Sequence, residues 1–467
     1  MTLARVRILE DSGATPLGAR RTGSLGALRV FGIYFLAVGL LGLLSVHLTP
    51  ALGWLMPPAE LAAKAGYSDP SSFLQGASEI ARHGWFQPEN VWLIRLWPPG
   101  FMVLEAGVLR LFGETAPLLL PLLALSALAC AGWMLLLREV LLPVTPDWVA
   151  TAAPALPFLF PLTPFFLLSP LGLLFGETFA ISFFFIGFLL ALLAGRQRSW
   201  RLAVGSGIAL ALSAYMRSQF ELIVQSLTAV ALLLAVVAAA GALLRRRLRM
   251  DARTVAILLL AVIVAQGAML PWRYHNYRDS GKGTWVHTSG LIARNSLMRE
   301  QDLLAIGGAF VVQGGGHLAC KLEPSYCGSP DRTLFLRAFL RHPGEWLLEK
   351  ARLIPAYWLA PPAPTSMSDL RDQPSGPQAL ANILFFACFL AAWGCLWKVR
   401  RRPEFIVHAW MLFSLSGCLF AVYTLAHFEA RYFYLPKIFS VVELVMLVAL
   451  LRAGGARGVD ATSAVRP

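Results

Sequence analysis

Ten apolar segments, most of them close to twenty residues long, recur along this chain of 467 residues. A helix of about 20 apolar residues crosses the hydrocarbon core of a bilayer, where a helix satisfies its own backbone hydrogen bonds. The chain is 57% hydrophobic, with a mean hydropathy of +0.63, which excludes an ordinary soluble domain. We therefore predict an all-α polytopic membrane protein with about ten transmembrane helices. The predicted spans are 29–49, 116–138, 148–168, 178–194, 202–217, 219–243, 254–271, 380–397, 404–426 and 434–452.

The formal net charge of +14 is distributed in a way that favours a membrane topology over nucleic-acid binding. Short clusters of lysine and arginine separate the apolar segments, as is typical of cytoplasmic loops. The N-terminal segment lacks an A-x-A cleavage site, so we interpret 29–49 as a retained span. Both termini, 1–28 and 453–467, are then cytoplasmic, and this topology requires the apolar run 101–112 to be an interfacial or re-entrant helix. The main clusters fall on the cytoplasmic side at 196–201, 245–249 and 398–402.

Two long segments are predicted to lie outside the cell. The first, 50–115, interrupts the transmembrane core 29–271. The second, 272–379, combines glycine-rich and proline-rich stretches with helical patterns close to the membrane, and it precedes the C-terminal spans in 380–452.

Cys320 and Cys327 share the second external segment, whereas the other four cysteines lie in predicted spans. An oxidising exterior makes a local disulfide between these two plausible, with two free thiols as the alternative.

The first external segment contains an acidic residue close to the end of the first span, followed by two helical patterns. Asp69 comes shortly after the first span and is followed by a helical pattern that ends at Gly84. The sequence Trp-Pro-Pro-Gly at 97–100 then opens the apolar run 101–112, with proline at positions that a helix start tolerates. From the residues alone, Asp69 is equally explained as a solvated loop acid or as a helix N-cap.

This order of features resembles the first external loop of the GT-C superfamily, the multi-pass glycosyltransferases that use polyprenyl-phosphate-linked sugars. The pattern is similar to that of the protein O-mannosyltransferases and the aminoarabinose transferases that modify lipid A. The resemblance implies a GT-C-like fold, and it implies that Asp69 is the catalytic acid-base residue. Glu79 and Glu89 in the same segment are interpreted as surface charges.

Two further residues are candidates for the site once this resemblance is considered. Glu177 begins the fourth predicted span at its outer end, where relatives carry a similar acid. Arg217 lies between the fifth and sixth spans, on the side where the positive-inside rule does not expect an arginine. We interpret both as candidate substrate-binding residues, with structural pairing of an acid with an arginine, or a plain loop cation, as the alternatives.

Two more segments match the resemblance. The sequence PWRYHNYR at 271–278 supplies Arg273 and Arg278, and it carries His275 where relatives usually carry arginine. The sequence AHFEARYFYLPKIFS at 426–440 supplies cations that could meet a lipid phosphate, with Arg431 offering a planar fork. Interfacial anchoring by aromatic and basic residues is the alternative for both segments. The candidate residues of the second segment are His427, Glu429, Arg431, Tyr432 and Lys437.

The sequence therefore predicts an inverting glycosyltransferase of the cell membrane, such as a bacterial inner membrane. It would transfer a sugar from a polyprenyl-phosphate donor to a glycan, lipid or protein acceptor at the outer face. Membrane lipid is a further partner, and no nucleic-acid partner is expected. No D-x-D motif or histidine/cysteine cluster predicts a metal site, although the resemblance leaves a divalent ion open. The alternatives are a lipid or polysaccharide transporter, which the nearly apolar spans disfavour, and an inactive scaffold of the same fold.

Overall fold

A computed structural model gives the fold of the chain. It describes residues 24–49, 51–65, 69–159, 167–243, 251–286, 318–351, 358, 376–402, 404–425 and 434–463. Within these ranges every regular element is helical, which confirms the all-α prediction.

Nine of the ten predicted spans coincide with a continuous helix in the described part of the chain. Seven helices are long and apolar enough to cross a bilayer: α1, α6, α11, α13, α14, α21 and α23. The other two are shorter, since α12 has 17 residues and the apolar part of α22 is Phe405–Leu419. The bounds are α1 (Ser24–Leu44), α6 (Leu119–Leu141), α11 (Glu177–Gln197), α12 (Trp200–Met216), α13 (Gln219–Leu243), α14 (Ala252–Ser280), α21 (Gly376–Lys398), α22 (Phe405–Leu425) and α23 (Tyr434–Ser463).

The predicted span 148–168 is divided into short pieces as far as it is described. They are α7 (Asp147–Ala152), the 3-10 turn Ala153–Ala155 and α8 (Leu156–Leu159). Pro154 and Pro157 lack the backbone N–H that a continuous helix needs at those positions, so the α-helix is interrupted by a 3-10 turn there.

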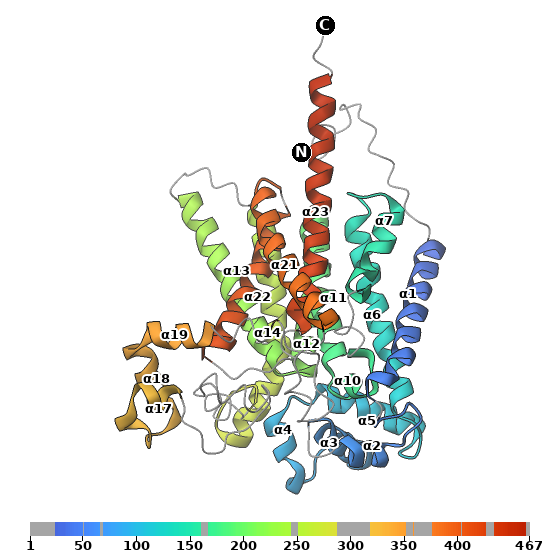
Figure 1. The fold of residues 1–467 in the computed structure, drawn as a ribbon, viewed down its shortest axis with the longest axis vertical. Helices are drawn as coiled ribbons and strands as arrows, with labels where there is room; N and C mark the ends of the chain where they lie inside the picture. Colours follow the sequence, from blue (N-terminus) through green and yellow to red (C-terminus); the bar gives the residue numbers. More distant parts are fainter. Residues whose placement is uncertain are drawn as a thin grey trace, which may run out of the picture.

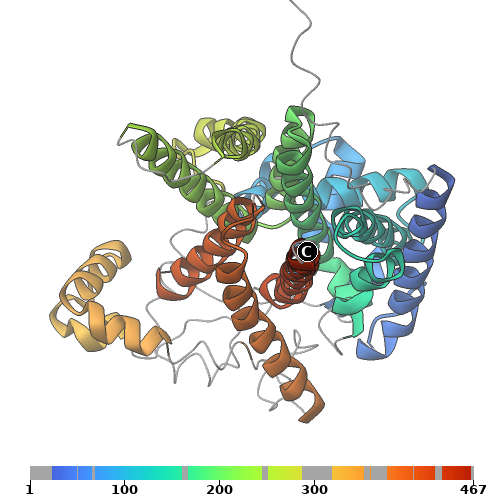
Figure 2. The same ribbon diagram turned by 90° about the horizontal axis from the view of Figure 1, so that it is seen from above.

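The long helices form one bundle with distinct ends. Figure 1 shows α2–α5 gathered at the lower end and α17–α19 beside the same end, while α23 extends beyond the other helices at the upper end. Seen along the spans in Figure 2, α23 stands near the middle, with α1 and the α17–α19 unit at opposite edges. We call the lower end the loop end, because both predicted external segments lie there.

The upper end, called the basic end below, brings together arginines from several helix ends, while the cluster 245–249 lies outside the described residues. Arg196 at the end of α11 donates to the carbonyl of Val140 near the end of α6 (2.8 Å), and Arg253 in α14 donates to the carbonyl of Arg198 (3.0 Å). Arg138 is almost fully buried and pairs with Asp147 at 2.6 Å. The helix ends that meet here are therefore those that the alternation of loops predicts to share one side.

Exposed aromatic side chains mark both ends of the bundle. Trp148, Trp200 and Trp397 are exposed at the basic end, and Tyr274 and Tyr277 continue the exposed apolar stripe of α14 at the loop end. Aromatic rings with one polar edge favour the two membrane–water interfaces. This distribution fits a bilayer that surrounds the bundle between the two rows.

Polar side chains pair with one another inside the spans, contrary to the expectation of almost wholly apolar spans. His408 of α22 and Glu443 of α23 are both buried, and the Nδ1 and Oε1 atoms are 2.8 Å apart. Gln266 of α14 donates to Gln225 and Thr228 of α13. Each of these groups finds a partner on the neighbouring helix, as polar side chains in lipid require.

The first interhelical segment folds into short helices that cap the bundle. They are the 3-10 turn Ser45–Leu48, α2 (Pro58–Ala65), α3 (Asp69–His83), the 3-10 turn Pro88–Asn90, α4 (Trp92–Leu96) and α5 (Gly100–Phe112). The 13 residues of α5 are too few to span a bilayer, as the predicted interfacial helix requires. Gly100 lets α5 approach the end of α12 closely, because a Cβ there would lie 2.6 Å from the carbonyl oxygen of Tyr215.

The helix α14 runs nine residues beyond the predicted end of its span at Pro271. The extension is held by side chains rather than by lipid. Trp272 and Asn276 are buried and donate to the carbonyl of Trp285 (both 2.9 Å), and Arg95 of α4 pairs with Asp279 (2.9 Å). The helix therefore continues past the predicted end of the span, because these long-range contacts outweigh the helix-breaking tendency of the proline.

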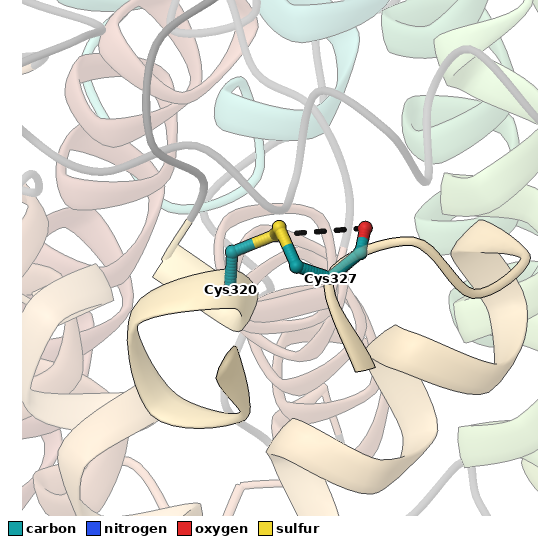
Figure 3. Close-up of a disulfide and its surroundings, with 2 residues drawn as sticks. All are labelled: Cys320 and Cys327. Atoms are coloured by element: carbon teal, nitrogen blue, oxygen red, sulfur yellow. Dashed lines mark hydrogen bonds between the residues drawn. A yellow bond between two sulfur atoms is a disulfide. The ribbon is translucent and has the colours of Figure 1, made fainter. Parts of the chain in front are cut away.

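The described part of the second long segment forms a small helical unit with its own core. It comprises α17 (Leu318–Leu322), the 3-10 turn Pro324–Tyr326, α18 (Asp331–Arg341) and α19 (Pro343–Ala351). Leu334, Ala338 and Trp346 pack against α17. A disulfide joins Cys320 to Cys327 across the turn, with the Cα atoms 4.8 Å apart (Figure 3).

Candidate active site

Three charged residues from distant parts of the chain meet at the loop end of the bundle. Arg217 Nη2 lies 3.3 Å from Asp69 Oδ2, and Arg217 Nε lies 3.1 Å from Glu177 Oε1. All three are candidates from the sequence analysis, and the structure brings them together. We call these residues the charged cluster.

Each acid stands at the first residue of a helix. Asp69 begins α3, and Glu177 begins α11 directly after Gly176. Gly176 has φ 71°, in the left-handed region that glycine adopts without strain. A Cβ at Gly176 would lie 2.8 Å from the ring of Phe101 in α5, so the turn that aims Glu177 also packs on the first segment. A carboxylate in the first helical turn is favoured by the helix dipole.

Arg217 occupies the break between two helices. The α12 helix ends at Met216, Arg217 is extended with φ −146° and ψ 132°, and α13 begins at Gln219. The extended backbone turns the guanidinium back across the ends of α3 and α11. Gln219 Nε2 donates to Glu177 Oε2 at 2.7 Å, so the same break supplies one hydrogen bond and one ion pair to the Glu177 carboxylate.

The charged cluster is nearly closed to solvent. The side chains of Arg217, Glu177 and Asp69 are 4%, 2% and 13% exposed. The Arg217 guanidinium carbon also lies 5.3 Å from the centre of the Phe73 ring, within the range of a cation–π contact. Buried charges are stable only when they are paired, and here two carboxylates share one arginine.

Two nitrogen atoms of Arg217 are buried without a hydrogen-bond partner among the described residues. They are Nε, which still forms an ion pair with Glu177, and Nη1. A buried guanidinium N–H without a partner is rare and costly in a folded protein. The Nη1 atom is therefore available to an oxygen of a bound molecule.

Other predicted site residues lie around the same end with separate partners. Arg273 pairs with Glu221 at the start of α13, and Arg278 is exposed on the α14 extension. Lys437 is buried in the first turn of α23. The predicted site residues that lie outside the described residues are His427, Glu429, Arg431 and Tyr432.

A divalent ion is not supported by the residues that are described. Among them, no group of three or more histidine, cysteine or acidic side chains gathers as a ligand set. Arg217 already stands between the two carboxylates of the charged cluster. These residues do not fit a resident metal, and we derive no step through one.

Neither family models nor curated proteins match this sequence. Two solved structures match it over nearly its whole length. The archaeal oligosaccharyltransferase AglB from Archaeoglobus fulgidus, in complex with an inhibitory peptide and a dolichol-phosphate, is 14% identical with a TM-score of 0.49, covering 94% of this chain and 52% of that chain. The apo crystal structure of the oligosaccharyltransferase of the same organism is 15% identical with a TM-score of 0.45, covering 95% and 53%. This chain thus spans about half the length of each matching chain.

Residues near the charged cluster that sequence reasoning missed are Gln219 and Phe73. Neither carries a charge, and their roles depend on contacts across more than 40 residues of sequence. The departure at His275 also has a structural explanation. Its ring stacks on Trp272 (5.1 Å between centroids) and meets the edge of Trp85 (6.3 Å), so an aromatic side chain suits this place.

Proposed function

We propose that this chain is a membrane glycosyltransferase of the GT-C class that uses a polyprenyl-phosphate-linked sugar. The observation that carries the proposal is the meeting of Asp69, Glu177 and Arg217 at the loop end. Two of these residues gained significance from a family resemblance and one from its unexpected side of the membrane. Their convergence supports a common site more strongly than any one motif does.

In the proposed reaction, Asp69 acts as the general base. It accepts the proton of an acceptor hydroxyl or amine while the acceptor atom forms a bond to the anomeric carbon. The bond from the anomeric carbon to the phosphate oxygen breaks, and polyprenyl phosphate leaves with the electron pair. Attack opposite the leaving group inverts the anomeric centre.

Arg217 is the cation best placed to receive the developing phosphate charge. Its Nη1 donor lacks a partner among the described residues, and its side chain lies in a water-poor environment where a charge-assisted hydrogen bond is strong. In this proposal Lys437, Arg273, Arg278 and Arg431 provide further positive charge around the lipid phosphate.

The loop end is proposed to face the outside of the cell. The described residues Arg138, Arg196 and Arg253 lie at the basic end, and positive charge favours the cytoplasmic side. A lipid donor would then reach the charged cluster from within the outer leaflet, and the acceptor would approach under the short helices α2–α5.

A transport function has some support from His408 and Glu443, because ionisable residues inside a membrane often mark an ion or proton path. The two functions differ in what happens to the lipid-linked sugar. A transporter moves it across the bilayer intact, whereas a transferase releases sugar-free polyprenyl phosphate.

The test is turnover by the full-length protein in lipid nanodiscs. A panel of polyprenyl-phosphate sugars is supplied with membrane extract as the acceptor source, and released polyprenyl phosphate is measured by mass spectrometry. We expect release with at least one donor and its loss in Arg217→Ala. Translocation of intact donor in proteoliposomes, with no release, would support the transporter instead. Neither release nor translocation, with donor binding retained, would support the inactive scaffold.

A further inference from the structure

A chain of hydrogen-bonded polar side chains runs along one side of α3 at the loop end. Gln75 Nε2 donates to Asn90 Oδ1 at 3.2 Å, and Asn90 Nδ2 donates to Glu79 Oε1 at 2.7 Å. Gln75 and Glu79 are four residues apart and His83 follows after four more, so the three share one face of the helix. We call Gln75, Glu79, His83 and Asn90 the polar strip.

The Glu79 carboxylate has one oxygen without a hydrogen bond. Its position in the sequence indicates a surface charge, yet the side chain is only 12% exposed. The Oε2 atom is buried and has no hydrogen-bond partner among the described residues, since His83 Nε2 is 4.0 Å away. Because the His83 side chain is 48% exposed, this oxygen lies just beneath the surface. A buried acceptor without a donor is costly, and an O–H group of a bound molecule would satisfy it.

Two exposed tryptophans belong to the same surface. Trp85 is 40% exposed and comes two residues after the end of α3, and Trp92 is 43% exposed and comes two residues after the last member of the polar strip. Gly84 turns the chain at φ 84°, a left-handed value that suits glycine. The Trp85 ring then meets the rings of Phe86 and His275 edge to face. Each tryptophan thus has a defined place and a side open to solvent.

We propose that this surface binds a carbohydrate chain, which is the acceptor of the glycosyl transfer. The inference rests on the proposed function and names the substrate class, a glycan of several sugars. A sugar ring presents hydroxyl groups to carboxylates and amides, and it presents a face of C–H groups to flat aromatic rings. The polar strip supplies the first kind of partner, and the two tryptophans supply the second.

The make-up of this surface distinguishes it from a membrane anchor. Aromatic rings alone suffice for an interfacial belt, and the exposed Tyr274 and Tyr277 of α14 provide them. Here two amides and a carboxylate accompany the rings, and a few placed polar groups beside aromatic side chains are typical of a small-molecule site. Figure 1 shows α3 and α4 at the loop end, with α4 furthest from the basic end. The surface therefore extends away from the spans.

The polar strip lies along the helix that begins with Asp69. Gln75 and Glu79 follow it by six and ten residues, which places them about 9 Å and about 15 Å along the helix axis. With the reacting hydroxyl at Asp69, the strip holds sugars further back in the acceptor chain. A single sugar reaches Asp69 without touching the strip, whereas a chain of several sugars contacts both. The site therefore favours long acceptors.

Two variants and two matched controls test this assignment. Glu79→Gln keeps the size of the side chain and removes the negative charge, so affinity for long acceptors should fall about tenfold, the usual weight of a hydrogen bond to a charged group. Trp92→Ala removes a stacking face and should lower that affinity about three- to tenfold. The controls are Glu89→Gln, an exposed acid beside the strip, and Trp200→Ala, an exposed tryptophan at the basic end.

The experiment uses oligosaccharides released from the cell envelope, separated by length and labelled with a fluorophore at the reducing end. Fluorescence anisotropy gives their affinity for the full-length protein in nanodiscs without donor. The same fractions then serve as acceptors with the best donor of the panel, which gives kcat and KM. Thermal unfolding accompanies each variant, so that all values refer to folded protein. We expect KM for acceptors of several sugars to rise in both variants with kcat nearly unchanged, and single sugars to respond to neither change.

Each outcome separates the two claims. Unchanged affinity and KM for long acceptors in both variants would overturn the inference and leave the proposed function intact. Transfer to a peptide or lipid only, with no glycan bound by the wild type, would do the same. An equal loss for single sugars and for long chains would also overturn it, because the strip would then not act through acceptor length. Glycan binding with the expected pattern but without sugar transfer would overturn the proposed function and keep the binding site. Neither binding nor transfer would overturn both.

Discussion

Replacing Glu105 with glutamine should remove a pH dependence of stability that is built into the capping helices. Glu105 lies in α5, is fully buried, and neither of its carboxylate oxygens has a hydrogen-bond partner among the described residues. Burial raises the pKa of Glu105 well above its usual value, which favours the protonated side chain in the folded protein.

The sign and size of the effect follow from linkage. In the unfolded chain a glutamate loses its proton above a pH of about 4.3, whereas folded Glu105 keeps it. The stability contributed by the protonated form is complete below that pH and is lost as the pH rises towards the folded pKa. Between the unfolded and the folded pKa, the loss is about 1.4 kcal/mol for each pH unit. Glutamine cannot ionise, so the Glu105→Gln variant does not lose this stability as the pH rises.

The assay is thermal unfolding of the purified protein in detergent, followed by tryptophan fluorescence at pH 5 and at pH 7. The desolvation cost of the buried glutamine amide is the same at both pH values. The test is therefore whether the difference in unfolding temperature between variant and wild type changes from pH 5 to pH 7. Scaled to a chain of 467 residues, each 1.4 kcal/mol of that lost stability corresponds to about 1.4 °C in favour of the variant at the higher pH. Glu89→Gln, which alters an exposed acid of the same segment, should show no such change. An unfolding difference for Glu105→Gln that is equal at both pH values would refute the reasoning.

Three further predictions address the architecture. A membrane-impermeant thiol reagent should label neither Cys320 nor Cys327 in intact cells until reductant is added, and labelling beforehand would show free thiols. Reporter tags at residue 248 should indicate the cytoplasm and tags at residue 320 the outside, whereas external labelling at 248 would overturn the span order. Gly100→Ala should lower the unfolding temperature by about 1–3 °C, because its Cβ meets a backbone carbonyl of α12 and an overpacked site costs about 1–3 kcal/mol. An unchanged temperature would mean that α5 packs more loosely there.

Much of the fold was predictable because lipid imposes simple rules on helices. Apolar length alone predicted the long helices such as α6 and α11, and turn residues predicted α3 and α5 to within one residue or so. The sequence did not predict features that depend on side chains from distant segments. The helix α14 continues past Pro271 because Trp272 and Asn276 donate to the backbone carbonyls of Thr284 and Trp285, a contact that local patterns do not reveal.

The candidate site was predictable in its charged members only. Asp69, Glu177 and Arg217 could be selected because charges are conspicuous at span boundaries. Their mutual distances could not be predicted, since the three lie on segments separated by about a hundred or by forty residues. Gln219 and Glu105 were missed for different reasons. An amide beside a span gives no signal in a sequence, and a carboxylate in an amphipathic helix gives no sign that it is buried without a partner.

The most direct test of the central claim is the turnover of Asp69→Asn. Asparagine preserves the size of the side chain but cannot accept the acceptor's proton. We predict that sugar transfer from the polyprenyl-phosphate donor falls by about 10²–10⁴-fold, with the affinity for the donor nearly unchanged and the protein folded and inserted. Turnover at the wild-type rate under these conditions would contradict the assignment of Asp69 as the base.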